Sequence, residues 1–215
     1  DNIGIITLPG NFNYGNRLQC YAMAEAVRQI GFNPFVLERE QPYSRSRQLY
    51  YSMKNTLLAI AGRETLSPEK MMSEGRKAAF RRFSRHIPTV LLPGNGYLVK
   101  DEYYRFIVGS DQVWNPNVIA HQEDWFFAKF ANREQRIAIA ASLGIDEFSE
   151  DSQSKRVAEG VKGFSHISVR EKRGAELICS CAGVNPQVLC DPTITVSSDK
   201  WRSISDGRLT PSSPY

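Results

Sequence analysis

Short apolar runs alternate with amphipathic stretches along the first part of the chain. Residues 2–8 (NIGIITL) and 34–38 (PFVLE) are apolar runs typical of short buried strands. Between them, apolar side chains at helical spacing predict a helix over residues 17–30, with Asn16 as its N-cap and Gly31 as its stop. Because a strand, a helix and a strand follow one another within about 40 residues, we expect a βαβ unit and a parallel sheet.

The same alternation returns after residue 90. Strands are predicted at residues 106–108, 137–141, 166–169 and 188–190, and helices at residues 152–163 and 173–179, with a short helix around Trp201. The pattern predicts an α/β fold, a Rossmann-like parallel sheet with helices on both faces. We expect this domain to cover residues 1–196, and residues 197–215 to be a linker toward a second domain that is absent from this chain.

Polar or glycine-rich clusters follow the predicted strands. They are PGNFNYGN, GSDQVWNP, SLG, REK and DP. In open parallel sheets the carboxyl ends of the strands form the edge at which ligands bind. Five clusters at this edge therefore predict a binding site there.

Charge is unevenly distributed. Residues 43–90 hold ten basic and three acidic side chains, a net charge of +7, which leaves −3 for the rest of a chain whose total is +4. This stretch reads as a basic helical insertion of two or three amphipathic helices. It is either a solvated helical face or a surface for anionic groups such as lipid head groups.

Cysteines and apolar runs limit the class of protein. The four cysteines form no C-x-x-C pair and have no histidine at ligand spacing, so we expect reduced structural cysteines and no zinc. No apolar run is long enough to span a membrane, and no signal peptide is visible. We therefore expect a cytoplasmic location, at the inner face of the membrane if the basic stretch contacts lipid.

Several side chains at the strand ends have chemistry suited to a site. Arg170 offers a guanidinium for a carboxylate or phosphate, the alternative being a salt bridge with Glu171 or Asp191. Asp111 is either a general base for a hydroxyl or a helix cap. Trp114 is either a stacking platform or, as we favour, core packing. His166 begins its strand, away from the ligand edge, which favours a structural role.

The loop at residues 10–16 precedes a helix, so its amides and asparagines form a candidate cradle for an anion or for sugar hydroxyls; the alternative is a loop that only caps the helix. Its glycines do not fit the G-x-G-x-x-G spacing of dinucleotide-binding loops.

The order of five segments resembles that of the polysaccharide pyruvyl transferases. These are NFNYGNRLQCYA, YRFIVGSDQVWNP, AASLG, SVREKRGAELI and VLCDPTI, and the resemblance covers nearly the whole chain. It implies the N-terminal half of a GT-B-like two-domain enzyme that moves the pyruvyl group of phosphoenolpyruvate onto a sugar of a cell-surface polysaccharide or its lipid-linked precursor. It implies a cyclic ketal product, and neither a metal, a cofactor nor a nucleic-acid partner.

The resemblance and the strand-end pattern together give the candidate site. Asp111 and Arg170 are the candidate catalytic residues. The candidate binding residues are Gly10, Asn11, Asn13, Tyr14, Gly15, Asn16, Gly109, Ser110, Gln112, Trp114, Asn115, Ser142, Gly144, Ser168 and Glu171. Two alternatives remain open at this point: a GT-B-like glycosyltransferase that uses a nucleotide sugar, and a non-catalytic glycan- or anion-binding domain.

Overall fold

The computed structural model describes residues 1–10, 13–39, 72–92 and 100–205. Within them a seven-stranded sheet, parallel throughout, has the order β3-β2-β1-β4-β5-β6-β7. The strands are β1 (Asn2–Ile6), β2 (Asn33–Arg39), β3 (Thr89–Leu92), β4 (Arg105–Val108), β5 (Arg136–Ala141), β6 (His166–Val169) and β7 (Gln187–Val188). The predicted α/β fold with a Rossmann-like parallel sheet is confirmed.

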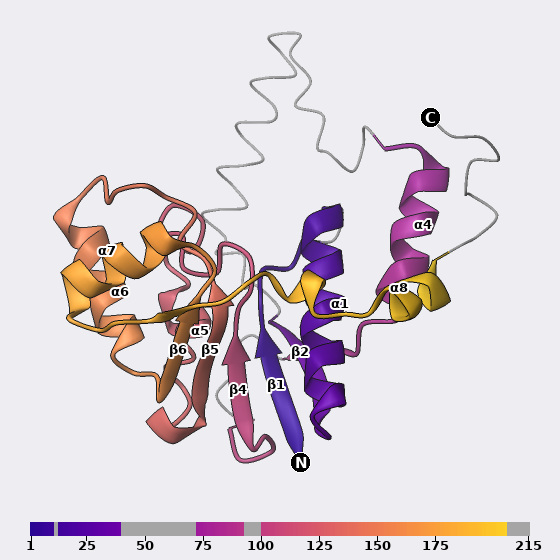
Figure 1. Cartoon of the computed structure of the whole chain (residues 1–215), viewed down its shortest axis with the longest axis horizontal. Helices are drawn as coiled ribbons and strands as arrows, with labels where there is room; N and C mark the ends of the chain where they lie inside the picture. Colours follow the sequence, from indigo (N-terminus) through magenta and orange to yellow (C-terminus); the bar gives the residue numbers. More distant parts are fainter. Residues whose placement is uncertain (11–12, 40–71, 93–99, 206–215) are drawn as a thin grey trace, which may run out of the picture.

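Helices cover both faces of this sheet (Figure 1). The α-helices are α1 (Tyr14–Gln29), α4 (Glu74–Ser84), α5 (Glu123–Phe126), α6 (Asp151–Val161), α7 (Lys172–Ala182) and α8 (Ser198–Ile204). Two 3₁₀ turns, η2 (Arg133–Gln135) and η3 (Pro192–Ile194), join neighbouring elements. Within the described parts of the chain, no helix is long and apolar enough to cross a membrane.

Alternating side chains of the strands build two cores, one on each face. Ile5 of β1 packs with α1, and with Phe83 of α4 and Trp201 of α8 at the margin. Ile6, the next residue, points to the other face and packs with side chains of α5, α6 and α7. Because successive strand residues point to opposite faces, the continuous apolar run of β1 serves both cores.

The start of α1 differs from the prediction. We expected Asn16 to cap a helix beginning at residue 17, but Asn13 is the N-cap and the helix begins at Tyr14. The Asn13 side chain accepts a hydrogen bond from the backbone N–H of Asn16, which frees the Asn16 side chain for other contacts. At the other end Gly31, with φ of 88°, follows the C-cap Ile30 and stops the helix as predicted.

The stretch predicted as a basic helical insertion, residues 43–90, lies outside the described residues up to residue 71. Its described part contains the basic helix α4 and the start of β3. β3 pairs in parallel with β2 and was not predicted. Its four residues, TVLL, are a short apolar run at the edge of the sheet. The run overlaps the end of the helical stretch predicted up to residue 90, so it was not recognised as a strand.

β1 and β4 form the switch point of the sheet. From β1 the chain winds through β2 to β3 at one edge, and from β4 it winds through β5 and β6 to β7 at the other. The connections that leave the carboxyl ends of β1 and β4 therefore diverge to opposite faces, which opens a crevice between them. The sequence clusters PGNFNYGN and GSDQVWNP both begin at this point.

Candidate functional site

A cleft of about 470 Å³ lies at the carboxyl edge of the sheet, beside the switch point. Its walls come from four parts of the chain: the start of α1, the turn after β4, the residue that follows β6, and the returning segment that runs from β7 to α8. The lining residues are Asn13, Gly15, Asn16, Leu18, Gln19, Asp111, Arg170, Asp191, Thr193 and Trp201. The cleft thus gathers side chains that are far apart in sequence.

Asn16 ties the first wall to the second. Its side chain is almost wholly buried, with 2% of the residue exposed. Its Oδ1 accepts hydrogen bonds from the Gly10 N–H (2.9 Å) and from Arg17 Nη2 (3.1 Å). Its Nδ2 donates to the Leu8 carbonyl (2.7 Å) and to Asp111 Oδ2 (3.0 Å). A single amide therefore fixes both the loop after β1 and the carboxylate after β4.

The loop after β1 is also packed tightly around Asn16. A Cβ on Gly10 would overlap the Asn16 side chain, so only glycine fits at that position beside the amide. Arg17 makes a long ion pair with Glu38 (3.8 Å), and Arg17 is 3% exposed.

Asp111 sits in an unusual turn. Its φ is 55°, in the left-handed region, and Gly109 before it has φ of 140°. The Asp111 carbonyl accepts a hydrogen bond from the Ser142 N–H (3.0 Å), which joins the turn to the end of β5. Aspartate tolerates this conformation better than most residues. The hydrogen bond from Ser142 fixes the backbone of the turn, and the turn presents the Asp111 carboxylate to the cleft.

Arg170 is held by two carboxylates. Its Nε donates to Glu171 Oε1 (2.8 Å) and its Nη1 donates to Asp191 Oδ2 (2.9 Å). Burial works against the charge, but these hydrogen bonds outweigh it and raise the pKa of Arg170 above its ordinary value. Asp191 is held in turn by Thr193, whose N–H and Oγ1 both donate to its Oδ1 (2.9 and 2.7 Å). The guanidinium therefore has a fixed orientation at the cleft wall.

A second buried amide lies below the cleft. Gln19 Nε2 donates to Thr7 Oγ1 (2.7 Å), and Gln19 Oε1 accepts from the Ser110 N–H (3.1 Å). These three residues are nearly buried, so their bonds join α1 to the ends of β1 and β4 in a medium of low dielectric. The floor of the cleft is rigid for this reason.

A model of one protein family, polysaccharide pyruvyl transferase, matches residues 13–213. The chain belongs to this family. The match includes every lining residue of the cleft, from Asn13 to Trp201. No curated protein and no solved structure matches the chain.

In this pyruvyl transferase family member, five of the candidate site residues line the cleft together. They are Asn13, Gly15, Asn16, Asp111 and Arg170. Glu171 does not line the cleft, but it is paired with Arg170, which does. Gly10 supports Asn16, and Asn11 lies outside the described residues.

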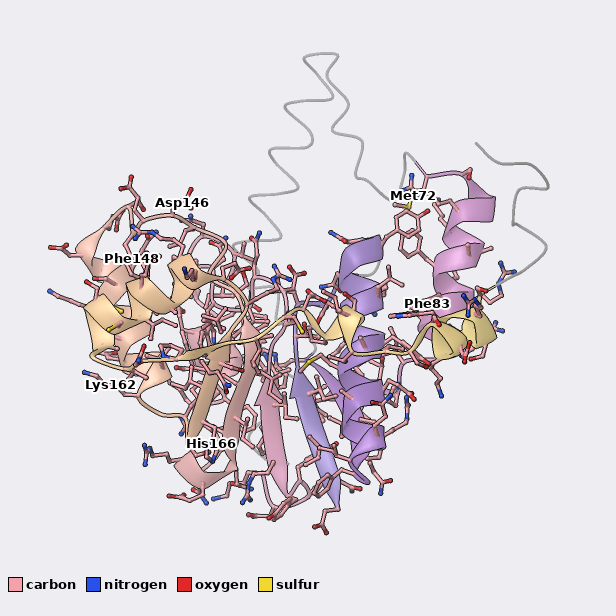
Figure 2. The ribbon with its side chains drawn as sticks, in the orientation of Figure 1. Met72, Phe83, Asp146, Phe148, Lys162 and His166 are labelled. Carbon is pink, nitrogen blue, oxygen red and sulfur yellow. The ribbon has the colours of Figure 1, made fainter. Side chains whose placement is uncertain are left out.

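Two candidate residues, Trp114 and Tyr14, lie away from the cleft, as does His166, for which the sequence favoured a structural role. Trp114 is fully buried, stacks on Phe127 and donates its Nε1–H to the Phe126 carbonyl (3.1 Å), so we assign it to the core. Tyr14 is exposed and stacks on Phe80 of α4. His166 lies at the amino-terminal edge of the sheet (Figure 2).

The remaining candidates hold the turns at the ends of β4 and β5. Ser168 Oγ bridges two backbone groups of β5. Ser110 and Ser142 are fully buried. Gln112 accepts a hydrogen bond from Asn115 (2.8 Å) and packs against Gly144, whose φ of 59° suits glycine. We infer that these residues shape the cleft and do not touch its contents.

Five lining residues were not among the candidates: Leu18, Gln19, Asp191, Thr193 and Trp201. Asp191 is one of the two salt-bridge partners that the sequence allowed for Arg170. Gln19 lies about one helical turn after Asn16, so a helix begun at the correct residue would have placed both amides on one face. Trp201 lies in the stretch that we predicted as a linker with a short helix around this residue, and that helix is confirmed as α8. It packs back against α1, and Lys200 pairs with Glu25 (3.1 Å).

Proposed function

We propose that this protein transfers the pyruvyl group of phosphoenolpyruvate to a sugar of a cell-surface polysaccharide or its lipid-linked precursor, with a cyclic ketal as product. The observation that carries this proposal is the cleft at the switch point of a pyruvyl transferase family member, in which a fixed guanidinium and a carboxylate line the same cavity. A guanidinium suits the anionic donor, and a carboxylate suits the acceptor hydroxyls.

The chemistry sets the demands on the site. Protonation of the methylene carbon of phosphoenolpyruvate leaves a cation at C2, which one sugar hydroxyl attacks with loss of its proton. Phosphate then leaves with the C–O bonding electrons, and a second hydroxyl closes the ring at C2 with loss of its proton. The net reaction turns a diol and phosphoenolpyruvate into a ketal and inorganic phosphate. The protein must hold anionic oxygens, supply a proton and accept protons from hydroxyls.

Arg170 is the proposed donor contact and Asp111 the proposed base. Arg170 reaches the cleft while Glu171 and Asp191 hold two of its nitrogens, so the donor carboxylate or phosphate would meet a guanidinium that is already oriented. Asp111 uses Oδ2 for the bond from Asn16, and its carboxylate lines the same cavity. Asn16 would thereby orient the base.

The test uses the full-length protein with phosphoenolpyruvate and a panel of cell-surface glycans. We expect phosphate release together with a gain of one ketal-linked pyruvate in the mass of the glycan. Release of a nucleoside diphosphate from a nucleotide sugar, with no reaction of phosphoenolpyruvate, would replace the proposal by a glycosyltransferase. Glycan binding without either reaction would favour a non-catalytic domain.

A matched pair of arginine variants tests the donor contact. Arg170→Ala should weaken phosphoenolpyruvate binding by at least about tenfold, as expected for the loss of a charged hydrogen-bonding partner. Arg173→Ala is the control, because Arg173 is exposed, pairs with Glu176 and does not line the cleft. Unchanged donor affinity in Arg170→Ala would remove Arg170 from the proposal.

We also propose that the basic stretch contacts an anionic membrane surface during the reaction. Its described helix, α4, and the C-cap that follows it expose Arg81, Arg82 and Arg85. Binding to vesicles that contain phosphatidylglycerol should weaken as salt rises, because screening reduces attraction between exposed charges. Binding that is equal for neutral vesicles would contradict this contact.

A further inference from the structure

The described walls of the cleft do not carry a surplus of positive charge. The lining residues include one arginine and two aspartates, and the arginine is paired with Asp191 and Glu171. Asn13, Asn16 and Gln19 add amide groups. Groups of this kind exchange hydrogen bonds with hydroxyls, so these walls suit a neutral ligand rich in hydroxyl groups beside the anion contact.

One tryptophan side chain faces this polar cavity. The chain has three tryptophans, all within the described residues, and two of them, Trp114 and Trp125, are 0% and 5% exposed in the core. Trp201 is partly exposed and lines the cleft. Of the three, it is the tryptophan that a ligand in the cleft would contact.

Contacts with other residues of the protein hold the Trp201 indole in place. Its Nε1–H donates to the Thr193 carbonyl (3.3 Å), and its ring lies against Tyr21 of α1, with centroids 5.3 Å apart and an interplanar angle of 48°. The ion pair between Lys200 and Glu25 joins α8 to α1 beside it. An aromatic ring that is fixed before binding loses little conformational entropy when a ligand packs against it.

We propose that Trp201 is the platform on which a pyranose ring of the acceptor stacks, with its hydroxyls directed to Asp111 and Asn13. A pyranose has an apolar face of C–H groups and an edge of hydroxyls, which matches an indole beside a carboxylate and an amide. Only the role of the sugar as acceptor rests on the proposed pyruvyl transfer; the stacking itself does not.

Intrinsic fluorescence tests the contact without any turnover. Methyl glycosides of common hexoses and N-acetylhexosamines are titrated into the full-length protein. At least one should shift the emission saturably and reduce quenching by acrylamide. Trp201→Phe should lose this response, whereas Trp125→Phe, which alters a buried ring of α5, should keep it. A response that survives in Trp201→Phe, or no response to any glycoside that serves as acceptor, would overturn the proposal.

Kinetics separate this inference from the proposed function. Trp201→Phe keeps an aromatic ring against Tyr21, so circular dichroism should match the wild type. Trp201→Ala should raise the KM for the acceptor about tenfold, the scale of one lost stacking contact, and should change the KM for phosphoenolpyruvate less than about twofold. A glycoside response without any pyruvyl transfer would refute the proposed reaction and keep the sugar platform. Equal effects on both KM values would refute the platform.

Discussion

Replacing Asn16 by alanine is the sharpest test of how the cleft is built. The change removes four hydrogen bonds at once: to the Gly10 N–H, the Leu8 carbonyl, Arg17 and Asp111. The two neutral bonds are worth about 1 kcal/mol each, and the two to charged partners about 1.5 kcal/mol or more each. Because Asp111 is partly accessible, water recovers some of this loss, and we expect the free energy of unfolding to fall by about 3 kcal/mol.

The matched control lies three residues earlier. Asn13 is exposed and its side chain makes one capping bond, to the Asn16 N–H (3.1 Å). Asn13→Ala should therefore cost about 1 kcal/mol, the usual value for a lost N-cap. The free energy of unfolding of both variants is measured by urea denaturation followed by circular dichroism. The comparison sets the loss of one asparagine against the loss of the other in the same loop.

Activity gives the second readout for Asn16. If the amide orients Asp111, kcat in Asn16→Ala should fall by at least about tenfold, because small displacements of a reacting group are costly. The reasoning is wrong if Asn16→Ala is no less stable than Asn13→Ala. A normal kcat in a folded Asn16→Ala would separately refute the link between this amide and the carboxylate.

Three further predictions follow from other parts of the site. Gly109→Ala should lower the free energy of unfolding by about 3 kcal/mol or more, because φ at this residue is 140° and the new methyl would overlap a carbonyl oxygen of β5. A urea midpoint equal to that of the wild type would contradict this. Asp191 is subject to burial, which opposes its charge, but bonds from its neighbours and Arg170 keep its pKa below the ordinary 3.8. A carboxyl whose pKa is lower in the folded state adds stability that is complete at neutral pH and is lost as the pH falls through that folded pKa. Asp191→Asn should therefore be less stable than wild type at pH 7 and converge with it only below pH 3.8. A constant difference in stability at all pH values would contradict this. Burial raises the pKa of Cys20 to about 12, so a thiol reagent should modify the exposed Cys190 in the native protein and spare Cys20 until unfolding, and early labelling of Cys20 would disagree.

The sheet is largely predictable from the sequence because its strands are short apolar runs with both faces buried. β1, β2, β4, β5 and β6 fall within about a residue or two of their predicted positions. The strand-end rule also predicts that Asp111 and Arg170 lie at one edge of the sheet, where both line the cleft. The prediction missed β3, a four-residue apolar run at the edge of the sheet that is too short to stand apart from the helical stretch predicted over residues 43–90.

The inner arrangement of the cleft is less predictable. The sequence shows two asparagines, Asn13 and Asn16, but not which of them caps the helix and which crosses to Asp111. That choice depends on how far apart the ends of β1 and β4 lie in the folded protein, which the local sequence does not specify. The sequence motifs draw attention to Trp114, yet Trp201 is the tryptophan at the cleft, because its position is decided by how α8 returns to α1 and not by neighbouring residues.

The most direct test of the central claim is where phosphoenolpyruvate binds. Backbone amide chemical shifts of the full-length protein are recorded with and without the donor under conditions in which no acceptor is present. We predict the largest changes at Asp111, at Arg170 and around Thr193, with little change at Asn2 and His166 on the opposite edge of the sheet. Saturable binding that leaves the amides of the cleft unchanged would contradict the assignment of this cleft as the donor site.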